Sequence, residues 1–214
     1  MINRDPGKAW RDGYTSNFYD LAKSVTDHTI LDPSRLWEIY SHLSQVPTNG
    51  DLAELGVYRA GAARFMALAC PQRTLWLFDT FSGIPETDPS IDWIKKGHFD
   101  DGTLEQAQAY LADLPNVRIV PGLFPESAAG VPESTRFSLV HLDADIYTST
   151  MAGLEWFWPK MIAGGVVIVD DFDLPQCPGA TRATKEFFTT HPDHQGSKSI
   201  PPSVCVRKLC ASTT

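Results

Sequence analysis

The sequence predicts an α/β protein built on a doubly wound, mostly parallel sheet, and two observations carry that prediction. Short apolar runs of strand length alternate with stretches of helical spacing from residue 52 to residue 209, the order expected of βαβ units with right-handed crossovers. The clearest run, Val166 to Val169, is unbroken and β-branched, which is typical of a strand covered on both faces. A length of 214 residues favours a single domain with one large core.

The N-terminal segment gives weaker signals than the rest of the chain. Its scattered aromatic side chains have no clear period, so it fits either a mobile cover or a short helix. Asp32 and Pro33 then provide an N-cap and a first helical residue for a helix over residues 33–45. We therefore expect residues 1–45 to form an N-terminal cover and helix, ahead of a main domain over residues 46–214.

The main domain shows the alternation of strands and helices. The expected strands cover residues 52–57, 74–78, 117–120, 137–142, 164–169 and 203–209. The expected helices cover residues 61–70, 103–111, 148–157 and 179–188. The connection over residues 80–102 is long, and such loops in compact domains are usually functional or disordered. Either it and the N-terminal segment close over a ligand, with Trp10, Tyr14, Trp93 and His98, or both are ordinary surface loops.

Composition limits the partners that we expect. A formal net charge of -8 disfavours sequence-independent binding to nucleic acid or anionic lipid, but it says nothing against metals or small cations. No stretch has the length and apolar character of a membrane helix or a signal peptide. The 4 cysteines lack Cys-x-x-Cys spacing and are too few for a disulfide scaffold. We expect a cytoplasmic protein that binds a small molecule, and leave a homodimer open.

The first strand of the main domain runs into a glycine-containing turn. Gly56 and Gly61 lie where a missing side chain lets the backbone approach a ligand. The dinucleotide fingerprint is not met, because Glu54 stands at its first glycine position. This carboxylate would repel a pyrophosphate and tolerate a cationic amino-acid or sulfonium group. Asp79 closes the next strand, 23 positions after Gly56, where an acidic side chain can bind ribose hydroxyls.

Two alternatives to a cationic nucleoside site exist. The glycines can serve only a tight turn, with Asp79 merely exposed. A short-chain dehydrogenase would also need a Tyr-x-x-x-Lys pair after the fourth strand, whereas the one such pair, Tyr19 and Lys23, precedes the nucleotide unit. The dehydrogenase is therefore disfavoured.

Two later strands end in acidic residues. Asp143 follows residues 137–142, and Asp170 with Asp171 follows Val169. Ligands of open α/β sheets bind beyond the carboxyl ends of the strands, and neighbouring strands would bring these three side chains together. Three carboxylates without a His or Cys ligand set favour Mg²⁺ over Zn²⁺, with room for a substrate that carries two adjacent oxygens. The alternative for Asp170 and Asp171 is a solvated acidic turn.

Three nearby side chains are ranked below this trio. His141 lies inside its strand and is expected to be a core or supporting histidine. Asp145 and Asp173 are expected to support the site or to face solvent, and both are left out of it.

Several stretches in fixed order give the chain a specific resemblance. The matching stretches are Gly50–Gly61, Asp79–Pro85, His141–Tyr147, Pro159–Asp171 and Pro178–Ala183. Over roughly residues 30–190, the chain resembles the class I S-adenosylmethionine-dependent methyltransferases and, more narrowly, the macrocin O-methyltransferase family of sugar-modifying enzymes from antibiotic pathways. The resemblance implies a Rossmann-like sheet of seven strands with helices on both faces, bound S-adenosylmethionine and Mg²⁺.

The resemblance also implies roles for individual residues. The cofactor-binding residues would be Glu54, Gly56, Tyr58, Gly61, Asp79, Thr80, Gly122, Leu123, Phe124 and Asp143. Within that set, Glu54 and the glycines of the turn would frame the methionine part, Asp79 would bind the ribose, and Gly122 to Phe124 would lie near the adenine. The metal ligands would be Asp143, Asp170 and Asp171, and Asp143 would also be the general base.

These roles imply Mg²⁺-dependent transfer of a methyl group to one hydroxyl of a vicinal-diol sugar, on a glycosylated natural product. The nearest alternative keeps this chemistry but uses a catechol or another vicinal phenol. A non-catalytic protein with a nucleotide-binding fold is the remaining alternative.

Overall fold

The computed structural model describes residues 15–210. Its strands are β1 (Asp51–Leu55), β2 (Leu75–Asp79), β3 (Val117–Pro121), β4 (Phe137–Leu142), β5 (Met161–Val169), β6 (His194–Gly196) and β7 (Val204–Lys208). Its α-helices are α2 (Ser16–Val25), α3 (Pro33–Leu43), α4 (Gly61–Ala69), α5 (Leu104–Tyr110), α6 (Tyr147–Phe157) and α7 (Pro178–Thr190). Short 3-10 helices cover Thr26–His28, Glu126–Gly130 and Trp158–Lys160. Trp10 and Tyr14 lie outside the described residues.

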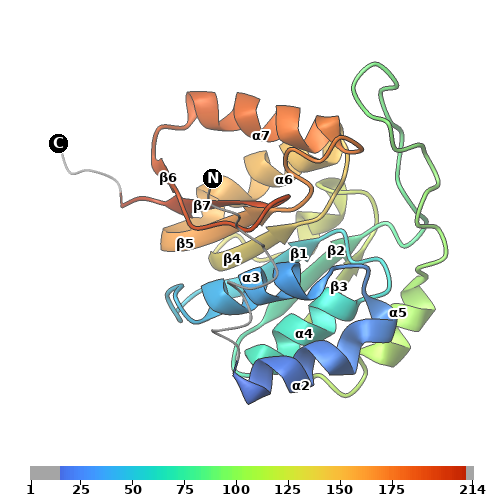
Figure 1. The fold of residues 1–214 in the computed structure, drawn as a ribbon, viewed down its shortest axis with the longest axis vertical. Coiled ribbons are helices and arrows are strands. Elements are labelled where there is room, and N and C mark those ends of the chain that lie inside the picture. Colours follow the sequence, from blue (N-terminus) through green and yellow to red (C-terminus); the bar gives the residue numbers. More distant parts are fainter. Residues whose placement is uncertain (1–14, 211–214) are drawn as a thin grey trace, which may run out of the picture.

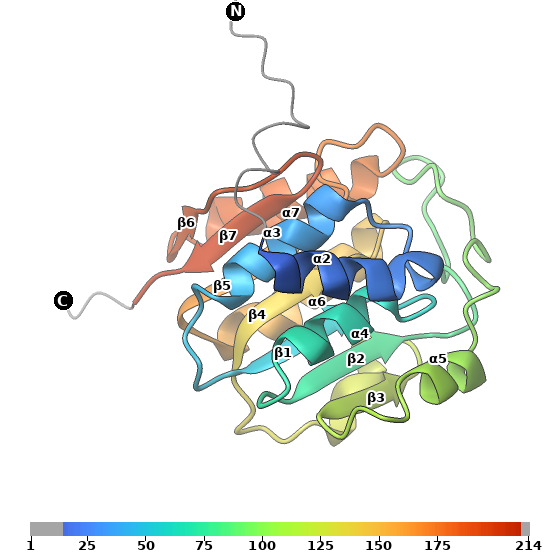
Figure 2. The same ribbon diagram turned by 60° about the horizontal axis from the view of Figure 1, so that its bottom comes forward.

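The strands form one seven-stranded sheet in the order β3-β2-β1-β4-β5-β7-β6. The first five strands of this order are parallel, whereas β7 runs antiparallel to both β5 and β6. Helices α2, α3 and α4 cover one face of the sheet, and α6 and α7 cover the other (Figures 1 and 2). The predicted doubly wound, mostly parallel sheet is therefore confirmed.

Local sequence signals explain where the helices begin. The Asp32 carboxylate accepts hydrogen bonds from the backbone nitrogens of Ser34 (2.7 Å) and Arg35 (3.3 Å), so α3 starts at the expected N-cap. Thr103 and Gln106 form a capping box at the start of α5. Arg35 lies in the first turn of α3, and its side chain reaches Asp170 and Asp171 just beyond the end of β5.

The core lies in two layers, one on each face of the sheet. Phe18 and Ile39 belong to the layer under α2, α3 and α4, whereas Phe157 and Phe187 belong to the layer under α6 and α7. The buried strand β4 contributes to both layers, since its successive side chains point to opposite faces. Helix α2 is thus part of the packed core, and the expected division at residue 45 stays a prediction.

Strands β1, β4 and β5 end level with one another. Leu55 pairs with Leu142, and Leu142 pairs with Val169. The hydrogen-bonded ladder continues one residue further, from the Asp143 nitrogen to the Leu55 oxygen (2.9 Å) and from the Asp170 nitrogen to the Leu142 oxygen (2.8 Å). The chain turns from β1 toward β2 on one side and from β4 toward β5 on the other. This is the switch point at which open α/β sheets bind ligands.

No helix within residues 15–210 combines the length and the apolar character that a membrane crossing requires.

Candidate active site

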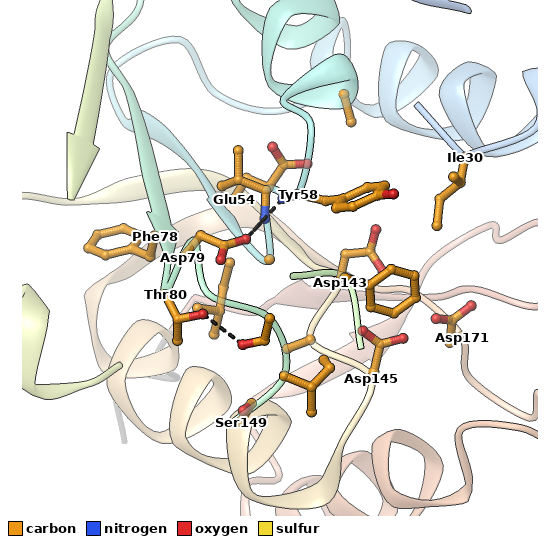
Figure 3. A pocket seen from close by; sticks show the side chains of 18 of the residues that line it. Ile30, Glu54, Tyr58, Phe78, Asp79, Thr80, Asp143, Asp145, Ser149 and Asp171 are labelled. Carbon is orange, nitrogen blue, oxygen red and sulfur yellow. Dashed lines mark hydrogen bonds between the residues drawn. The ribbon is translucent and has the colours of Figure 1, made fainter. Parts of the chain in front are cut away.

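A cavity of about 320 Å³ opens at the carboxyl ends of the strands. It is lined by all ten residues predicted to bind a cofactor: Glu54, Gly56, Tyr58, Gly61, Asp79, Thr80, Gly122, Leu123, Phe124 and Asp143. Asp171 also lines it, and Figure 3 shows that Asp143, Asp145 and Asp171 approach from one side while Glu54 and Asp79 approach from the other. The two motifs found separately in the sequence therefore meet at one cavity, although the role of each residue stays a prediction.

Gly56 is required by a close approach of two backbone segments. Its φ is +89°, and a Cβ at this position would lie 1.7 Å from the carbonyl oxygen of Asp143. At Gly61, a Cβ would lie 2.5 Å from the carbonyl oxygen of His28. The turn after β1 is thus compressed between β4 and the segment before α3, and a side chain cannot be added without moving one of them.

Asp79 ties the two turns beside the cavity to each other. Its Oδ2 accepts hydrogen bonds from the backbone nitrogens of Val57 (2.6 Å) and Tyr58 (2.9 Å), and its Oδ1 accepts one from Phe81 (2.7 Å). Figure 3 shows this side chain beside Thr80, whose hydroxyl donates to the Gly83 oxygen (2.8 Å). Asp79 therefore holds the glycine turn against β2. The alternative interpretation, in which Asp79 is merely an exposed residue, does not account for these hydrogen bonds.

Glu54 and His141 form a buried pair on adjacent strands. The distance between Glu54 Oε1 and His141 Nδ1 is 2.9 Å, and both residues are about 1% exposed. Burial raises the pKa of Glu54, and the Glu54 carboxylate raises that of His141 against the opposite effect of burial. The other oxygen, Glu54 Oε2, is buried without a hydrogen-bond partner. Because Glu54 lines the cavity, a cationic ligand group could supply the missing hydrogen-bond donor for this oxygen.

The three predicted metal ligands gather beyond β4 and β5. Burial first, and then Asp170 and Asp171, raise the pKa of Asp143 well above its usual range. Burial and Asp170 also raise the pKa of Asp171, and Asp170 is 2% exposed. Carboxylates crowded in this way fit a hard divalent cation, which would neutralise their mutual repulsion. Asp170 and Asp171 are both buried, so the alternative in which they form a solvated acidic turn is wrong.

Arg35 is a site residue that the sequence interpretation missed. Its Nη1 donates to Asp170 Oδ2 (2.6 Å) and to Asp171 Oδ1 (3.1 Å). Burial lowers the pKa of Arg35, but the Asp170 carboxylate more than offsets this, so the guanidinium stays charged. These contacts join residues 135 and 136 positions apart in the chain, and nothing in the local sequence points to them.

The structure also brings Asp145 into the cluster. Asp145, Asp171 and Cys177 offer ligand atoms within 4.8 Å of one another. Burial and the neighbouring Asp171 raise the pKa of Asp145 to about 8. Asp145 (φ +58°) and Asp171 (φ +56°) both have left-handed backbone conformations. Asp173, by contrast, is exposed and pairs with Lys185 at 3.1 Å, outside the cluster.

The long connection over residues 80–102 is anchored to the rest of the domain. Asp92 is 5% exposed, and its Oδ1 accepts a hydrogen bond from the Tyr147 nitrogen (2.9 Å) at the start of α6. Ile84 and Phe99 line the cavity, whereas Trp93 is 68% exposed and does not. In Figure 1 this connection runs out beyond the edge of the layered body, in green. Part of it therefore borders the cavity.

Known proteins share both the sequence and the fold. The chain is 33% identical, over 72% of its length and 66% of the relative's, to the 8-demethyl-8-(2,3-dimethoxy-alpha-L-rhamnosyl)-tetracenomycin-C 4'-O-methyltransferase of Streptomyces olivaceus. It is 32% identical to the demethyldecarbamoylnovobiocin O-methyltransferase of Streptomyces niveus, over 75% of this chain and 67% of that one. The alignments thus span about two thirds of the length of these curated relatives.

Solved structures of methyltransferases are also similar to this chain. The O-methyltransferase NovP superposes with a TM-score of 0.74 at 27% identity, covering 86% of this chain and 83% of that one. The calicheamicin methyltransferase CalS11 gives a TM-score of 0.69 at 19% identity, over 91% and 93% of the two chains, which shows a shared fold. The family model for macrocin O-methyltransferase (TylF) matches residues 20–195. The chain belongs to the macrocin O-methyltransferase family.

Proposed function

We propose that this protein is a Mg²⁺-dependent O-methyltransferase that methylates one hydroxyl of a vicinal-diol sugar on a glycosylated natural product. The observation that carries the proposal is the meeting of two motifs at one cavity. Glu54, Gly56 and Asp79 line one part of it, and Asp143 and Asp171 line another. The relatives' names, which refer to tetracenomycin and novobiocin derivatives, support an acceptor of this kind.

The residues present fit S-adenosylmethionine. Glu54 Oε2 is a buried acceptor without a partner, and it would receive the positive charge of the methionine part. Asp79 would present its carboxylate to the ribose from a position already fixed by three backbone hydrogen bonds. Phe124 is buried and Leu123 is 52% exposed, so the two could enclose an adenine ring from the β3 side.

The residues also fit a divalent cation, because Asp143, Asp170 and Asp171 supply oxygen ligands of the type that Mg²⁺ prefers. When bound, the ion would supply Lewis-acid activation of a sugar hydroxyl, and S-adenosylmethionine would supply the methyl group. Asp143 lines the cavity, and its carboxylate would be the general base that accepts the hydroxyl proton. The cavity walls would hold the two reacting groups in line and exclude water.

The experiment that tests this function is an acceptor panel with a labelled methyl donor, run with and without Mg²⁺. The panel contains glycosylated natural products with vicinal diols, catechols and singly hydroxylated analogues. We expect labelled product from a vicinal-diol sugar that disappears with EDTA and returns with Mg²⁺. Transfer to catechols alone would favour the phenol alternative, and binding of S-adenosylhomocysteine without any transfer would favour the non-catalytic one.

A matched pair of variants tests the metal-binding carboxylates. Asp171→Asn removes a proposed ligand and should lower transfer at least about tenfold, because even the loss of a group that only supports a metal ligand costs about 10–100-fold. Asp173→Asn changes an exposed residue of the same loop, paired with Lys185, and should leave transfer within about twofold of wild type. Equal activity of both variants would contradict the assignment.

A further inference from the structure

One nitrogen of Arg35 stands between the two carboxylates that follow β5. Nη1 lies 2.6 Å from Asp170 Oδ2 and 3.1 Å from Asp171 Oδ1, so a single atom donates to both residues. The contact is shielded from water, since the side chains of Arg35, Asp170 and Asp171 are 18%, 1% and 10% exposed. The guanidinium thus contacts carboxylate oxygens of the kind that would also bind a divalent ion.

The four carboxylates of the cluster need a cation beside them, and while no ion is bound a side chain must supply it. Asp143, Asp145, Asp170 and Asp171 interact electrostatically at close range. Among residues 15–210, no basic side chain other than that of Arg35 forms an ion pair with any of the four. Removing the cation from buried carboxylates strongly destabilises a folded protein. Arg35 therefore acts as the resident counter-ion of the cluster.

Arg35 and a divalent ion cannot use the same two oxygens in the same way. Mg²⁺ takes its oxygen ligands at about 2.1 Å, whereas the guanidinium nitrogen needs about 2.9 Å from each oxygen and carries a positive charge of its own. The other oxygens are also engaged: Asp170 Oδ1 accepts from the Ser203 hydroxyl (2.8 Å), and Asp171 Oδ2 lies 3.7 Å from Cys177 Sγ. A divalent ion held by Asp170 and Asp171 would therefore compete with Nη1 for oxygens that the guanidinium now contacts.

Arg35 has a further carboxylate nearby, that of Asp32. The Nε of Arg35 lies 3.8 Å from Asp32 Oδ2, and the Asp32 side chain is 56% exposed. The same Nε is buried without a hydrogen-bond partner, so the guanidinium is incompletely satisfied in its present position. The Asp32 carboxylate would therefore remain as a partner of Arg35 if the contacts of Nη1 with Asp170 and Asp171 were lost.

We propose that Arg35 and the catalytic divalent ion are alternative counter-ions of the Asp170–Asp171 pair, so that ion binding displaces the guanidinium and Arg35 sets the affinity for the ion. The proposal rests on the metal site of the proposed function. Arg35 is thus a positioning residue that holds the acidic cluster together until the ion arrives.

The test is Mn²⁺ binding to the full chain, without methyl donor or acceptor, measured by calorimetry and by the electron paramagnetic resonance signal of free Mn²⁺. Arg35→Gln removes the charge, and Arg35→Lys keeps it. Arg64→Gln is the matched control, because Arg64 pairs with exposed Asp113 (2.6 Å) away from the cluster. We expect Arg35→Gln to bind Mn²⁺ about tenfold more tightly than wild type, a coupling of ordinary size between two ligands. Arg35→Lys should stay within about threefold of wild type, and Arg64→Gln should be unchanged.

A second readout is thermal stability. Without ion, Arg35→Gln should melt below wild type, and saturating Mn²⁺ should raise its Tm by more than it raises that of wild type. If Arg35→Gln folds only after Mn²⁺ is added, the dependence itself supports competition, and failure to fold with Mn²⁺ overturns it. Equal or weaker Mn²⁺ binding by Arg35→Gln also overturns it, even if methyl transfer depends on metal. If neither wild type nor Arg35→Gln binds Mn²⁺, the metal part of the proposed function fails as well.

Discussion

Glu54 and His141 face each other on β1 and β4, with Glu54 Oε1 2.9 Å from His141 Nδ1 in a setting that is closed to water. The two residues are also register partners in the sheet, so the backbone fixes their separation. Burial raises the pKa of Glu54, and the Glu54 carboxylate raises the pKa of His141 against the opposite effect of burial. His141 therefore fixes the position of a buried carboxyl group that lines the cavity.

This pair gives a first prediction. His141→Ala should lower the free energy of unfolding by about 3 kcal/mol, because Glu54 would be left buried without its partner. It should also weaken S-adenosylhomocysteine binding. Val140→Ala is the control, since Val140 is buried on the same strand but belongs to the core layer of the other face. Urea unfolding should show both variants to be destabilised, whereas calorimetry should show normal S-adenosylhomocysteine affinity for Val140→Ala alone. Normal affinity of His141→Ala would contradict the role of the pair.

A second prediction concerns His42, which is 2% exposed on α3. Its Nε2 lies 2.9 Å from the Lys198 oxygen, its Nδ1 has no hydrogen-bond partner, and burial lowers its pKa below 6.5. The unfolded chain therefore binds more protons below pH 6.5, and stability that is present above this pH is lost as the pH falls. The slope from one such group reaches about 1.4 kcal/mol per pH unit.

The measurement compares unfolding of wild type and His42→Gln between about pH 8 and about pH 5. We expect the wild-type free energy of unfolding to fall relative to that of His42→Gln as the medium is acidified. The difference isolates His42 from the buried carboxylates, whose raised pKa values act in the opposite direction. Two parallel curves would show that His42 does not titrate differently in the folded state.

A third prediction compares Asp79, at the carboxyl end of β2, with Asp51, at the amino end of β1. Asp79→Ala leaves the backbone nitrogens of Val57, Tyr58 and Phe81 without their acceptor, so the glycine turn should loosen. We expect S-adenosylhomocysteine affinity to fall at least about tenfold, the effect of losing charged hydrogen bonds. Asp51→Ala removes the acceptor of Trp76 Nε1 (2.8 Å) at the amino end of β1. It should cost stability and leave that affinity unchanged; loss of affinity in both would point to general destabilisation.

A fourth prediction concerns the connection over residues 80–102. Asp92→Ala removes its anchor on α6, and backbone amides between residues 84 and 98 should then exchange with deuterium at least about tenfold faster. Because Ile84 lines the cavity, KM for the acceptor should rise while S-adenosylhomocysteine affinity changes little. Asp88→Ala removes only local hydrogen bonds to Ser90 and serves as control. Unchanged exchange in Asp92→Ala would show that other contacts hold the loop.

Much of the fold could be predicted from local patterns. The β-branched run at the end of β5, the N-cap at Asp32 and the capping box at Thr103 lie where the structure has them. Helix α2 was ambiguous because its apolar residues meet the core over a short stretch, with Phe18 and Val25 buried. Strand β6 was missed, since it spans only His194–Gly196 and depends on pairing with β7.

The site was predictable to the extent that its residues end strands. Asp143, Asp170 and Asp171 could be found because parallel neighbouring strands deliver their last residues to the same edge. Arg35 could not, because its contacts depend on how α3 packs across the sheet, which no local period encodes. From the sequence, Asp145 ranked below the three proposed metal ligands, because its contact with Asp171 also depends on the folded backbone. Its left-handed backbone turns the side chain back toward Asp171, and a sequence shows only that a second carboxylate follows two positions later.

Asp145 and Asp171 have left-handed backbone conformations, so the residue type that is best for stability at these two positions differs from the one that the proposed reaction needs. Glycine adopts this conformation without strain, and burial next to other carboxylates adds a further cost for each aspartate. Selection for heat resistance alone would therefore install glycine or asparagine at both sites. A library of heat-resistant variants should lose acidity here first, and the aspartates that resist such replacement in an activity-based selection would be those that the reaction requires.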